Sequence, residues 1–414
     1  MHQLDETLAR RSDEERRHRA APGGERSARL HIALVTETYP PELNGVSLSV
    51  CRAVDYLRER GHAVEVVRPR QRVDDARRLR KEEVLLHGMA LPLYPGVRFG
   101  FPAARRLRTR WLQQRPDVVH VATEGPLGWS ALRAASSLRI PVTADYRTHF
   151  QRYSGHYGVA WLSRPIDAYL RRFHNRAHMT FVSTAALQRE LQSRGFENLA
   201  QVGRGIDTQL FNPDRRSALL RRRWGLREGE LAVIYVGRLA PEKNLDLVLR
   251  AYERVRQVRA DARMIWVGDG PLRRRLQQAH PDHVHAGLQR GAELASHYAS
   301  GDLFLFPSLT ETFGNVTLEA LASGLAVIAF NEAAAAQHGR DRTNARLVPS
   351  GDEDAFINAA VEAACVPELL AHLRANAPKA VAAVSWPSVL SIFERHLLAS
   401  AHGYRLYANS ATAN

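Results

Sequence analysis

Two glutamates stand eight positions apart in the stretch SLTETFGNVTLEALASG, residues 308–324. Two carboxylates that flank one glycosidic bond form the catalytic pair of many glycoside hydrolases. Glu311 and Glu319, however, are separated by a Phe-Gly-Asn turn between an apolar strand, DLFLFPS, and an apolar helix. This arrangement favours two separate contacts to one ligand over a hydrolytic pair.

The strand and helix on either side of the turn predict where each carboxylate lies. Glu311 follows a buried strand and should point into the cleft at the strand's carboxyl end. Gly314, Asn315 and Val316 open the next helix, where free backbone N–H groups favour an anion. Glu319 lies one turn further on and can accept hydrogen bonds from ribose hydroxyls. The alternative is a charged loop followed by a glutamate that complements the helix dipole.

Two cations occupy an equivalent loop in YVGRLAPEKNL. Arg238 and Lys243 follow a strand and precede a helix, so both can reach the cleft. A forked guanidinium and a compact ammonium together could bind a diphosphate without a metal ion. Outside a cleft, the same two residues would be solvated surface charges.

Glycines mark two more strand-end turns. Gly45, in PPELNGV, and Gly268, in VGDGP, would let the backbone approach a ligand closely. The alternative for Gly45 is an ordinary Asn-Gly turn. No G-x-G-x-x-G motif follows the first strand, which argues against a nicotinamide cofactor.

The strand DVVHVATEGPLG supplies two candidates in the N-terminal half. We expect His120 and Glu124 to end the strand and to face the cleft, where Glu124 would meet an acceptor hydroxyl. His120 is a candidate catalytic group, but a buried histidine with satisfied hydrogen bonds is an equally good interpretation.

Strands alternate with helical patterns along the whole chain, which predicts an α/β fold with two doubly wound, Rossmann-like domains facing a cleft. A two-domain dehydrogenase or a periplasmic-type binding protein would show the same order, so the fold alone does not give the function. The expected parts are a disordered tail (1–29), an acceptor-side domain (30–205), a donor-nucleotide domain (206–384), and a crossover helix with a tail (385–414).

The composition narrows the environment and the partners. The net charge is +15, which suits phosphate-bearing ligands, anionic membranes or nucleic acid. No nucleic-acid-reading motif or aromatic platform is recognisable, so we expect no nucleic-acid partner. The two cysteines lie far apart, and no apolar run is long enough to span a membrane. We therefore expect a cytoplasmic protein, with peripheral contact to the inner leaflet as one possibility.

That possibility depends on the segment Phe99–Arg115. In a helix, Ala104, Leu107 and Trp111 would share one apolar stripe, with arginines around the rest. Such a helix can lie on an anionic membrane surface. The alternative is a surface helix whose stripe packs on the sheet.

The quoted motifs together resemble those of retaining GT-B glycosyltransferases of the family-4 type. The resemblance covers about 30–398, and its most specific part is the E-x7-E motif of PSLTETFGNVTLEALASG. It is closest to bacterial GDP-mannose-dependent mannosyltransferases and related enzymes that act on glycolipids. The resemblance implies a nucleotide-diphosphate sugar donor, with GDP-mannose favoured over UDP-sugars. It also implies a lipid or glycan acceptor, retention of configuration and no metal cofactor.

The resemblance also implies residue roles. Gly45 would approach the donor phosphate, Arg238 and Lys243 would bind the diphosphate, and Glu311 would hold hydroxyls of the donor sugar. Glu319 would bind the ribose. The backbone at 314–316 would contact phosphate or sugar, and the strand end HVHAG, around His285, would border the base.

The sequence departs from the family pattern after the strand IPVTADY. Arg147 stands where many relatives have a histidine, and His149 follows two positions later, so the acceptor-side base stays open. Two other enzyme types share parts of the pattern. One is a nucleotide-sugar 2-epimerase, and the other is a glycogen-phosphorylase-like enzyme, which would need a much longer chain.

Overall fold

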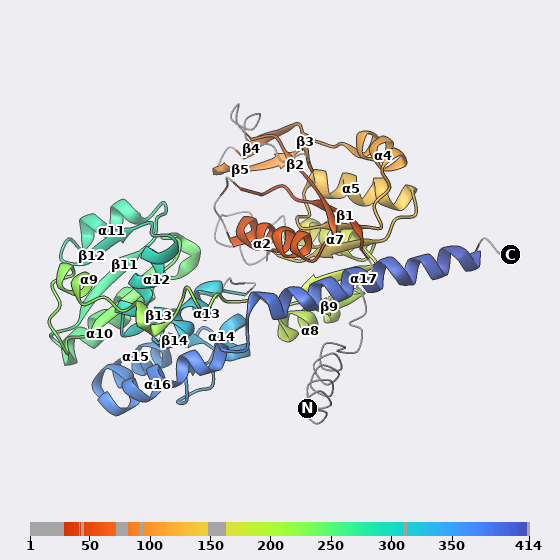
Figure 1. The fold of residues 1–414 in the computed structure, drawn as a ribbon. Coiled ribbons are helices and arrows are strands. Elements are labelled where there is room, and N and C mark those ends of the chain that lie inside the picture. Colours follow the sequence, from red (N-terminus) through yellow and green to blue (C-terminus); the bar gives the residue numbers. More distant parts are fainter. Residues whose placement is uncertain are drawn as a thin grey trace, which may run out of the picture.

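Two parallel β-sheets form the two halves of the molecule in this computed structural model (Figure 1). The structure describes residues 29–40, 42, 45–71, 82–91, 94–147, 163–309, 311 and 313–411. Nearly all of the predicted tail lies outside these residues. The predicted α/β architecture of two Rossmann-like halves is confirmed, whereas the domain boundaries stay predictions.

The N-terminal sheet has seven strands in the order β3-β2-β1-β6-β7-β8-β9. Its inner strands are short apolar runs buried on both faces, as expected where helices cover a parallel sheet. The strands are β1 (His31–Val35), β2 (Ala63–Pro69), β3 (Glu83–Leu86), β6 (Val118–Val121), β7 (Val142–Asp145), β8 (Met179–Val182) and β9 (Leu199–Gln201). A separate antiparallel hairpin joins β4 (Gly88–Leu91) and β5 (Tyr94–Gly100).

The C-terminal sheet has six strands in the order β12-β11-β10-β13-β14-β15. All of its pairings are parallel, so the carboxyl ends of the strands meet at one edge. The strands are β10 (Ala232–Val236), β11 (Arg263–Val267), β12 (Val284–Gly287), β13 (Leu303–Phe306), β14 (Ala326–Phe330) and β15 (Ala345–Val348).

Helices connect the strands in each half. Those of the N-terminal half are α2 (Gly45–Glu59), α4 (Ala104–Gln113), α5 (Pro126–Ser137), α7 (Ser163–His174) and α8 (Ala185–Ser193). Those of the C-terminal half are α9 (Ala218–Arg223), α10 (Leu245–Val258), α11 (Arg273–Ala279), α12 (Gly291–Ser300), α13 (Asn315–Ala322), α14 (Ala333–His338), α15 (Glu353–Cys365) and α16 (Pro367–Val381). Two short 3₁₀ helices, Pro213–Arg215 and Pro241–Lys243, complete the connections.

The last helix, α17 (Trp386–Ala411), returns to the N-terminal half, as predicted. In Figure 1 it leaves the C-terminal half and runs along the N-terminal one. Leu390, Phe393 and Leu397 pack in the same core cluster as β1 and α2. Helix α17 therefore covers one face of the N-terminal sheet, and α4 and α5 pack against the other.

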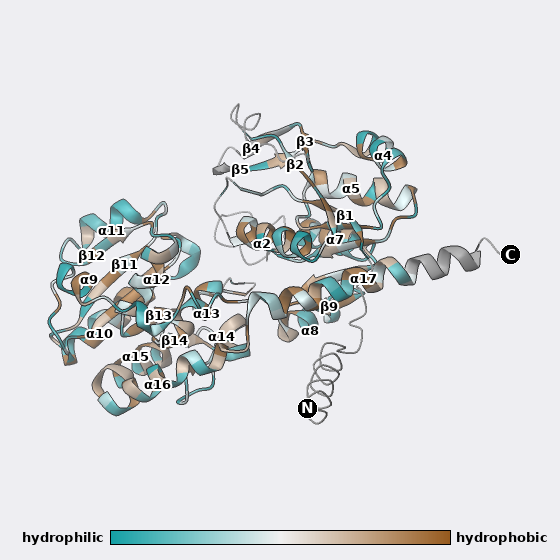
Figure 2. Cartoon of the chain, in the orientation of Figure 1, coloured by the Kyte–Doolittle hydropathy of each residue, from teal (hydrophilic) through white to brown (hydrophobic). Residues whose placement is uncertain are grey.

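Hydrophobic residues gather on the strands and on the inward sides of the helices (Figure 2). In the part of the chain that the structure describes, no single helix has both the length and the apolar character to cross a membrane. Helices α15 and α16 meet that test only together, and they are bent by 100° relative to each other.

Candidate functional site

The loops after β10 and β13 bring a cation and a carboxylate together. The ammonium of Lys243, in the loop after β10, forms an ion pair with the carboxylate of Glu311, in the loop after β13. The Ser308 hydroxyl donates to the same carboxylate at 3.0 Å. Because β10 and β13 are neighbours in the sheet, two residues 68 positions apart meet at its carboxyl edge.

Arg238 lies in the same loop as Lys243. Its guanidinium is 3.3 Å from the Glu242 carboxylate, and its side chain is 40% exposed. The Tyr235 hydroxyl donates to the Arg238 carbonyl at 3.1 Å, which ties the loop to the end of β10. The backbone of Arg238 is therefore fixed at the end of β10, and its side chain is paired with Glu242 and partly exposed.

Helix α13 begins as the sequence predicts. Gly314 has φ of 84°, a left-handed conformation that favours glycine. Asn315 and Val316 are the first two residues of the helix, and N–H groups in this position have no acceptor within the helix itself. The Glu319 carboxylate accepts a hydrogen bond from the Tyr298 hydroxyl at 2.8 Å. Burial raises the pKa of Glu319, and this hydrogen bond opposes the rise.

The N-terminal half meets this site through α2. A Cβ added to Gly45 would lie 3.8 Å from the Asn315 side-chain nitrogen. Further along α2, the charge of Arg52 lowers the pKa of Glu319, although less than burial raises it. Gly45, Asn315 and Glu319, which belong to different halves, therefore lie in one region.

Gly268 and His285 make contacts within the protein that account for their positions without a ligand. A Cβ on Gly268 would lie 1.9 Å from the Gly237 carbonyl oxygen, so the required close approach is to a neighbouring loop. His285 lies inside β12, and one nitrogen of its ring lies 3.1 Å from the His280 carbonyl oxygen. The placement of His285 therefore gives no support to contact with a base at the strand's end.

His120 does not end its strand, contrary to expectation. It pairs in register with Leu34 of β1 and Thr143 of β7, inside the sheet, and it is 1% exposed. Its two ring nitrogens lie 3.0 Å from the Thr143 hydroxyl and 3.2 Å from the Asp145 carboxylate. Phe393 of α17 packs edge-on against the ring. This placement favours the buried-histidine alternative.

Glu124 is also buried and does not face an open cleft. Its carboxylate lies 3.5 Å from the His174 ring. Nearby, Glu37 follows β1 and accepts the Leu127 N–H at 2.9 Å. Burial raises the pKa of Glu37 to about 7. The sequence analysis missed Glu37, although its place directly after a buried strand was a usable signal.

Arg147 is anchored by a second residue that the sequence analysis missed. Asp145 ends β7, and its carboxylate accepts hydrogen bonds from the Arg147 guanidinium. Burial alone would raise the pKa of Asp145, but the charges of Arg147 and His120 outweigh burial and hold it well below its usual range. His149, the other acceptor-side candidate, lies outside the described residues.

The apolar stripe of the segment Phe99–Arg115 is not free to enter a membrane. Helix α4 begins at Ala104, and its Leu107 and Trp111 are buried in the core beneath α5. The alternative interpretation, a surface helix packed on the sheet, is therefore correct for this stripe. Its arginines at 105, 106 and 108 remain exposed.

Two Rossmann-like halves with facing strand-end loops, one of them carrying paired cations and carboxylates, define a GT-B enzyme that uses an activated sugar. Comparison with known proteins agrees. The model described as "Glycosyltransferase Family 4" matches residues 43–210, and the one described as "Glycosyl transferases group 1" matches residues 230–364. The chain belongs to this family of glycosyltransferases, and it is a hexosyltransferase.

Several curated proteins share about a third of the aligned residues with this chain. A GDP-mannose-dependent α-mannosyltransferase of Mycobacterium tuberculosis is 37% identical, over 72% of this chain and 79% of the relative. The Corynebacterium glutamicum protein of that description is 33% identical, over 72% of each chain. The sulfoquinovosyl transferase SQD2 of Arabidopsis thaliana is 32% identical, over 72% of this chain and 59% of the relative.

Solved structures agree on the fold. Sucrose-phosphate synthase of Thermosynechococcus elongatus superposes with a TM-score of 0.71 at 18% identity, over 92% of this chain and 99% of that one. HepE of Anabaena, solved with UDP and glucose, gives 0.69 at 17% identity, over 89% and 99%. Identities this low support the shared architecture alone.

Proposed function

We propose that this chain transfers mannose from GDP-mannose to a lipid or glycan acceptor with retention of configuration. The observation that carries the proposal is the meeting of Lys243 and Glu311 beside the N-terminus of α13. The mannosyltransferase relatives supply the choice of sugar and base. Relatives named for glucose and sulfoquinovose transfer set the competing choices.

The donor-side residues have distinct roles in this proposal. Arg238 and Lys243 bind the diphosphate and stabilise the negative charge that develops as it leaves. The N–H groups at Asn315 and Val316 add to that stabilisation. Glu311 positions the sugar through its hydroxyls, and Glu319 binds the ribose. The departing diphosphate itself can take the proton of the acceptor hydroxyl, so transfer needs no separate protein base.

Transfer with retention has a direct test. The purified chain is incubated with GDP-mannose, UDP-glucose or ADP-glucose and a lipid extract, and the products are analysed by mass spectrometry. NMR of the new anomeric centre then gives the stereochemistry. We expect an α-mannosylated lipid from GDP-mannose. Rapid release of free sugar without an acceptor, or transfer from another donor alone, would contradict the proposal.

The proposed membrane contact uses the exposed side of α4, because the apolar stripe of this helix is buried. We propose a peripheral protein of the inner leaflet that docks through the exposed arginines of α4, with Phe101 and Leu112, which are 46% and 60% exposed. Electrostatic docking should weaken as salt screens the charges. Vesicles with anionic lipid should therefore bind the chain at low salt, and an R105Q/R106Q/R108Q variant should bind less. Binding that is insensitive to both changes would refute this surface.

A further inference from the structure

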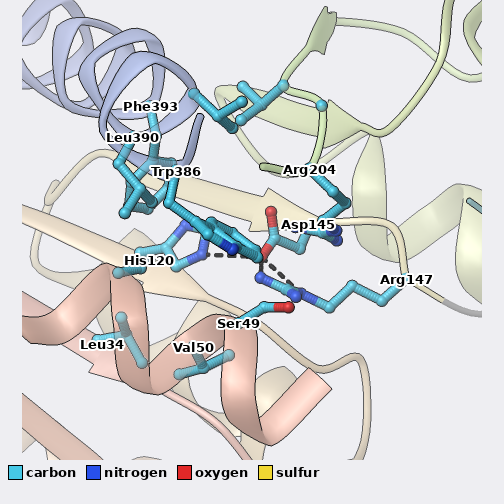
Figure 3. A pocket seen from close by; sticks show the side chains of 14 residues that line it. Leu34, Ser49, Val50, His120, Asp145, Arg147, Arg204, Trp386, Leu390 and Phe393 are labelled. Carbon is cyan, nitrogen blue, oxygen red and sulfur yellow. Dashed lines mark hydrogen bonds and ion pairs between the residues drawn. The ribbon is translucent and has the colours of Figure 1, made fainter. Parts of the chain in front are cut away.

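A second group of charges lies in the N-terminal half, away from the Lys243–Glu311 pair. Asp145, Arg147 and Arg204 are the charged side chains that line a small cavity between α2, β7 and the start of α17 (Figure 3). Arg204 belongs to the segment after β9, where the chain crosses to the C-terminal half. Figure 3 shows its side chain directed toward Asp145 and Arg147.

Among the residues that the structure describes, the charges that line this cavity do not balance. Asp145 is the one carboxylate among the lining residues, and it already accepts hydrogen bonds from Arg147 and lies 3.2 Å from the His120 ring. Arg204 makes no hydrogen bond or ion pair with any residue that the structure describes, although the charge of Asp145 attracts it. Burial, and after it the charge of Arg147, outweighs this attraction and lowers the pKa of Arg204 to about 9.

A cation in this position gains most from an added anion. Burying a charge costs free energy, and Arg204 is partly buried beside a second cation, so a bound anion would offset that cost. The guanidinium fork fits the two oxygens of a carboxylate or phosphate. The cavity volume is about 20 Å³, which is room for one or two groups the size of a water molecule. That space matches the leading oxygens of an oxyanion.

The cavity and the donor-side cations belong to different elements. Arg238 and Lys243 lie in the loop after β10 of the C-terminal sheet, whereas Asp145 ends a strand of the N-terminal sheet. Trp386 of α17 also lines the cavity, and its backbone would lie 2.5 Å from a Cβ on Gly205. The cavity thus lies where the N-terminal sheet meets the crossing segments.

We propose that Arg204 and Arg147 bind an anionic group, a carboxylate or a phosphate, that the acceptor carries. This inference rests on the proposed function, because it assigns the acceptor to the N-terminal half. It makes the acceptor an anionic lipid or glycan and makes Arg204 a determinant of acceptor specificity.

The first measurement needs no transfer. The full chain is saturated with GDP, so that the donor-side cations are occupied, and is titrated with inorganic phosphate by calorimetry. We expect Arg204→Gln to weaken phosphate binding at least tenfold. Arg171→Gln, which changes an exposed arginine of α7, is the control and should bind as the wild type does. Equal phosphate binding by the wild type and Arg204→Gln would overturn the inference.

The second measurement tests the acceptor. Values of kcat/KM are compared for a 4-nitrophenyl uronide and for its methyl ester, which differ in one carboxylate. We expect the wild type to prefer the carboxylate at least tenfold and Arg204→Gln to lose that preference, with Arg204→Lys in between. Transfer that is indifferent to the carboxylate or to Arg204 overturns the inference, whereas no transfer from any sugar nucleotide overturns the proposed function.

The melting temperature separates binding from folding. Because Arg204 makes no hydrogen bond or ion pair with a described residue, and the cost of its burial opposes the attraction of Asp145, Arg204→Gln should change the melting temperature little. A marked fall would instead assign Arg204 a structural role and would count against the site.

Discussion

Replacing each glutamate of the E-x7-E motif with glutamine should separate two kinds of affinity. In the free protein, Glu311 holds the ammonium of Lys243, and Glu319 accepts from Tyr298. Glutamine keeps the size of the side chain and an acceptor oxygen but removes the charge. If Glu311 positions the sugar, Glu311→Gln should weaken sugar-nucleotide binding relative to binding of the free nucleoside diphosphate.

The size of the effect follows from the lost interaction. A hydrogen bond to a charged group contributes roughly 1.5–3 kcal/mol, which corresponds to about a ten- to a hundredfold change in affinity. Affinity of Glu311→Gln for the free diphosphate should stay level or rise, because Lys243 no longer has Glu311 as a competing partner. Glu319→Gln should weaken both ligands equally, because both carry the ribose.

Calorimetry of each variant with GDP and with GDP-mannose measures both affinities. Glu353→Gln is a matched control, since Glu353 forms a surface ion pair with Arg250 in the same half. Two results would refute the assignment: a loss of GDP affinity in Glu311→Gln as large as the loss of GDP-mannose affinity, or full GDP affinity in Glu319→Gln. A hydrolytic pair would instead lose catalysis in both variants and keep GDP binding.

Three further predictions concern the diphosphate-binding cations, the buried carboxylate of Glu37 and the glycine beside it. Arg238→Ala and Lys243→Ala should each reduce kcat/KM at least tenfold with little change in melting temperature. Near-normal transfer by both variants would contradict the proposal that these two residues bind the diphosphate. Glu37 has a pKa of about 7 instead of about 4.5, so the folded state binds more protons between these values and stability should fall as pH rises through them. Denaturant unfolding should show this slope, at most about 3 kcal/mol, and Glu37→Gln should lack it; an unchanged slope would reject the buried carboxylate. Gly125→Ala should lower the melting temperature, because its Cβ would lie 1.8 Å from a Glu37 carboxylate oxygen, and a melting temperature equal to wild type would contradict that contact.

The sequence predicted the main strands and their alternation with helices because buried parallel strands are short apolar runs separated by helical patterns. This alternation also placed the loop residues Lys243 and Glu311 at the carboxyl ends of their strands. The strands β3, β4, β5, β9 and β15 were missed. Edge strands and hairpins carry a weaker apolar pattern, so composition separates them poorly from loops.

Side chains inside a strand were predicted less well than side chains after it. His120 and His285 were expected at strand ends because their strands end nearby in the sequence, yet each lies within the paired region. A shift of one or two residues in a strand's end decides whether a side chain faces the cleft or a covering helix. Sequence patterns do not fix strand ends that closely.

The environment of His120 shows most clearly which contacts sequence patterns do not reveal. Its ring is enclosed by Phe393, which lies more than 270 positions away on α17. The same helix contributes Trp386 to the cavity beside Arg204. Nothing in the sequence distinguishes Arg204 from the many other arginines of the chain. The burial of His120 and the cavity in which we propose an anion site therefore depend on the same long-range packing. When α17 crosses back over the N-terminal sheet, Phe393 covers the His120 ring and Trp386 lines the cavity beside Arg204.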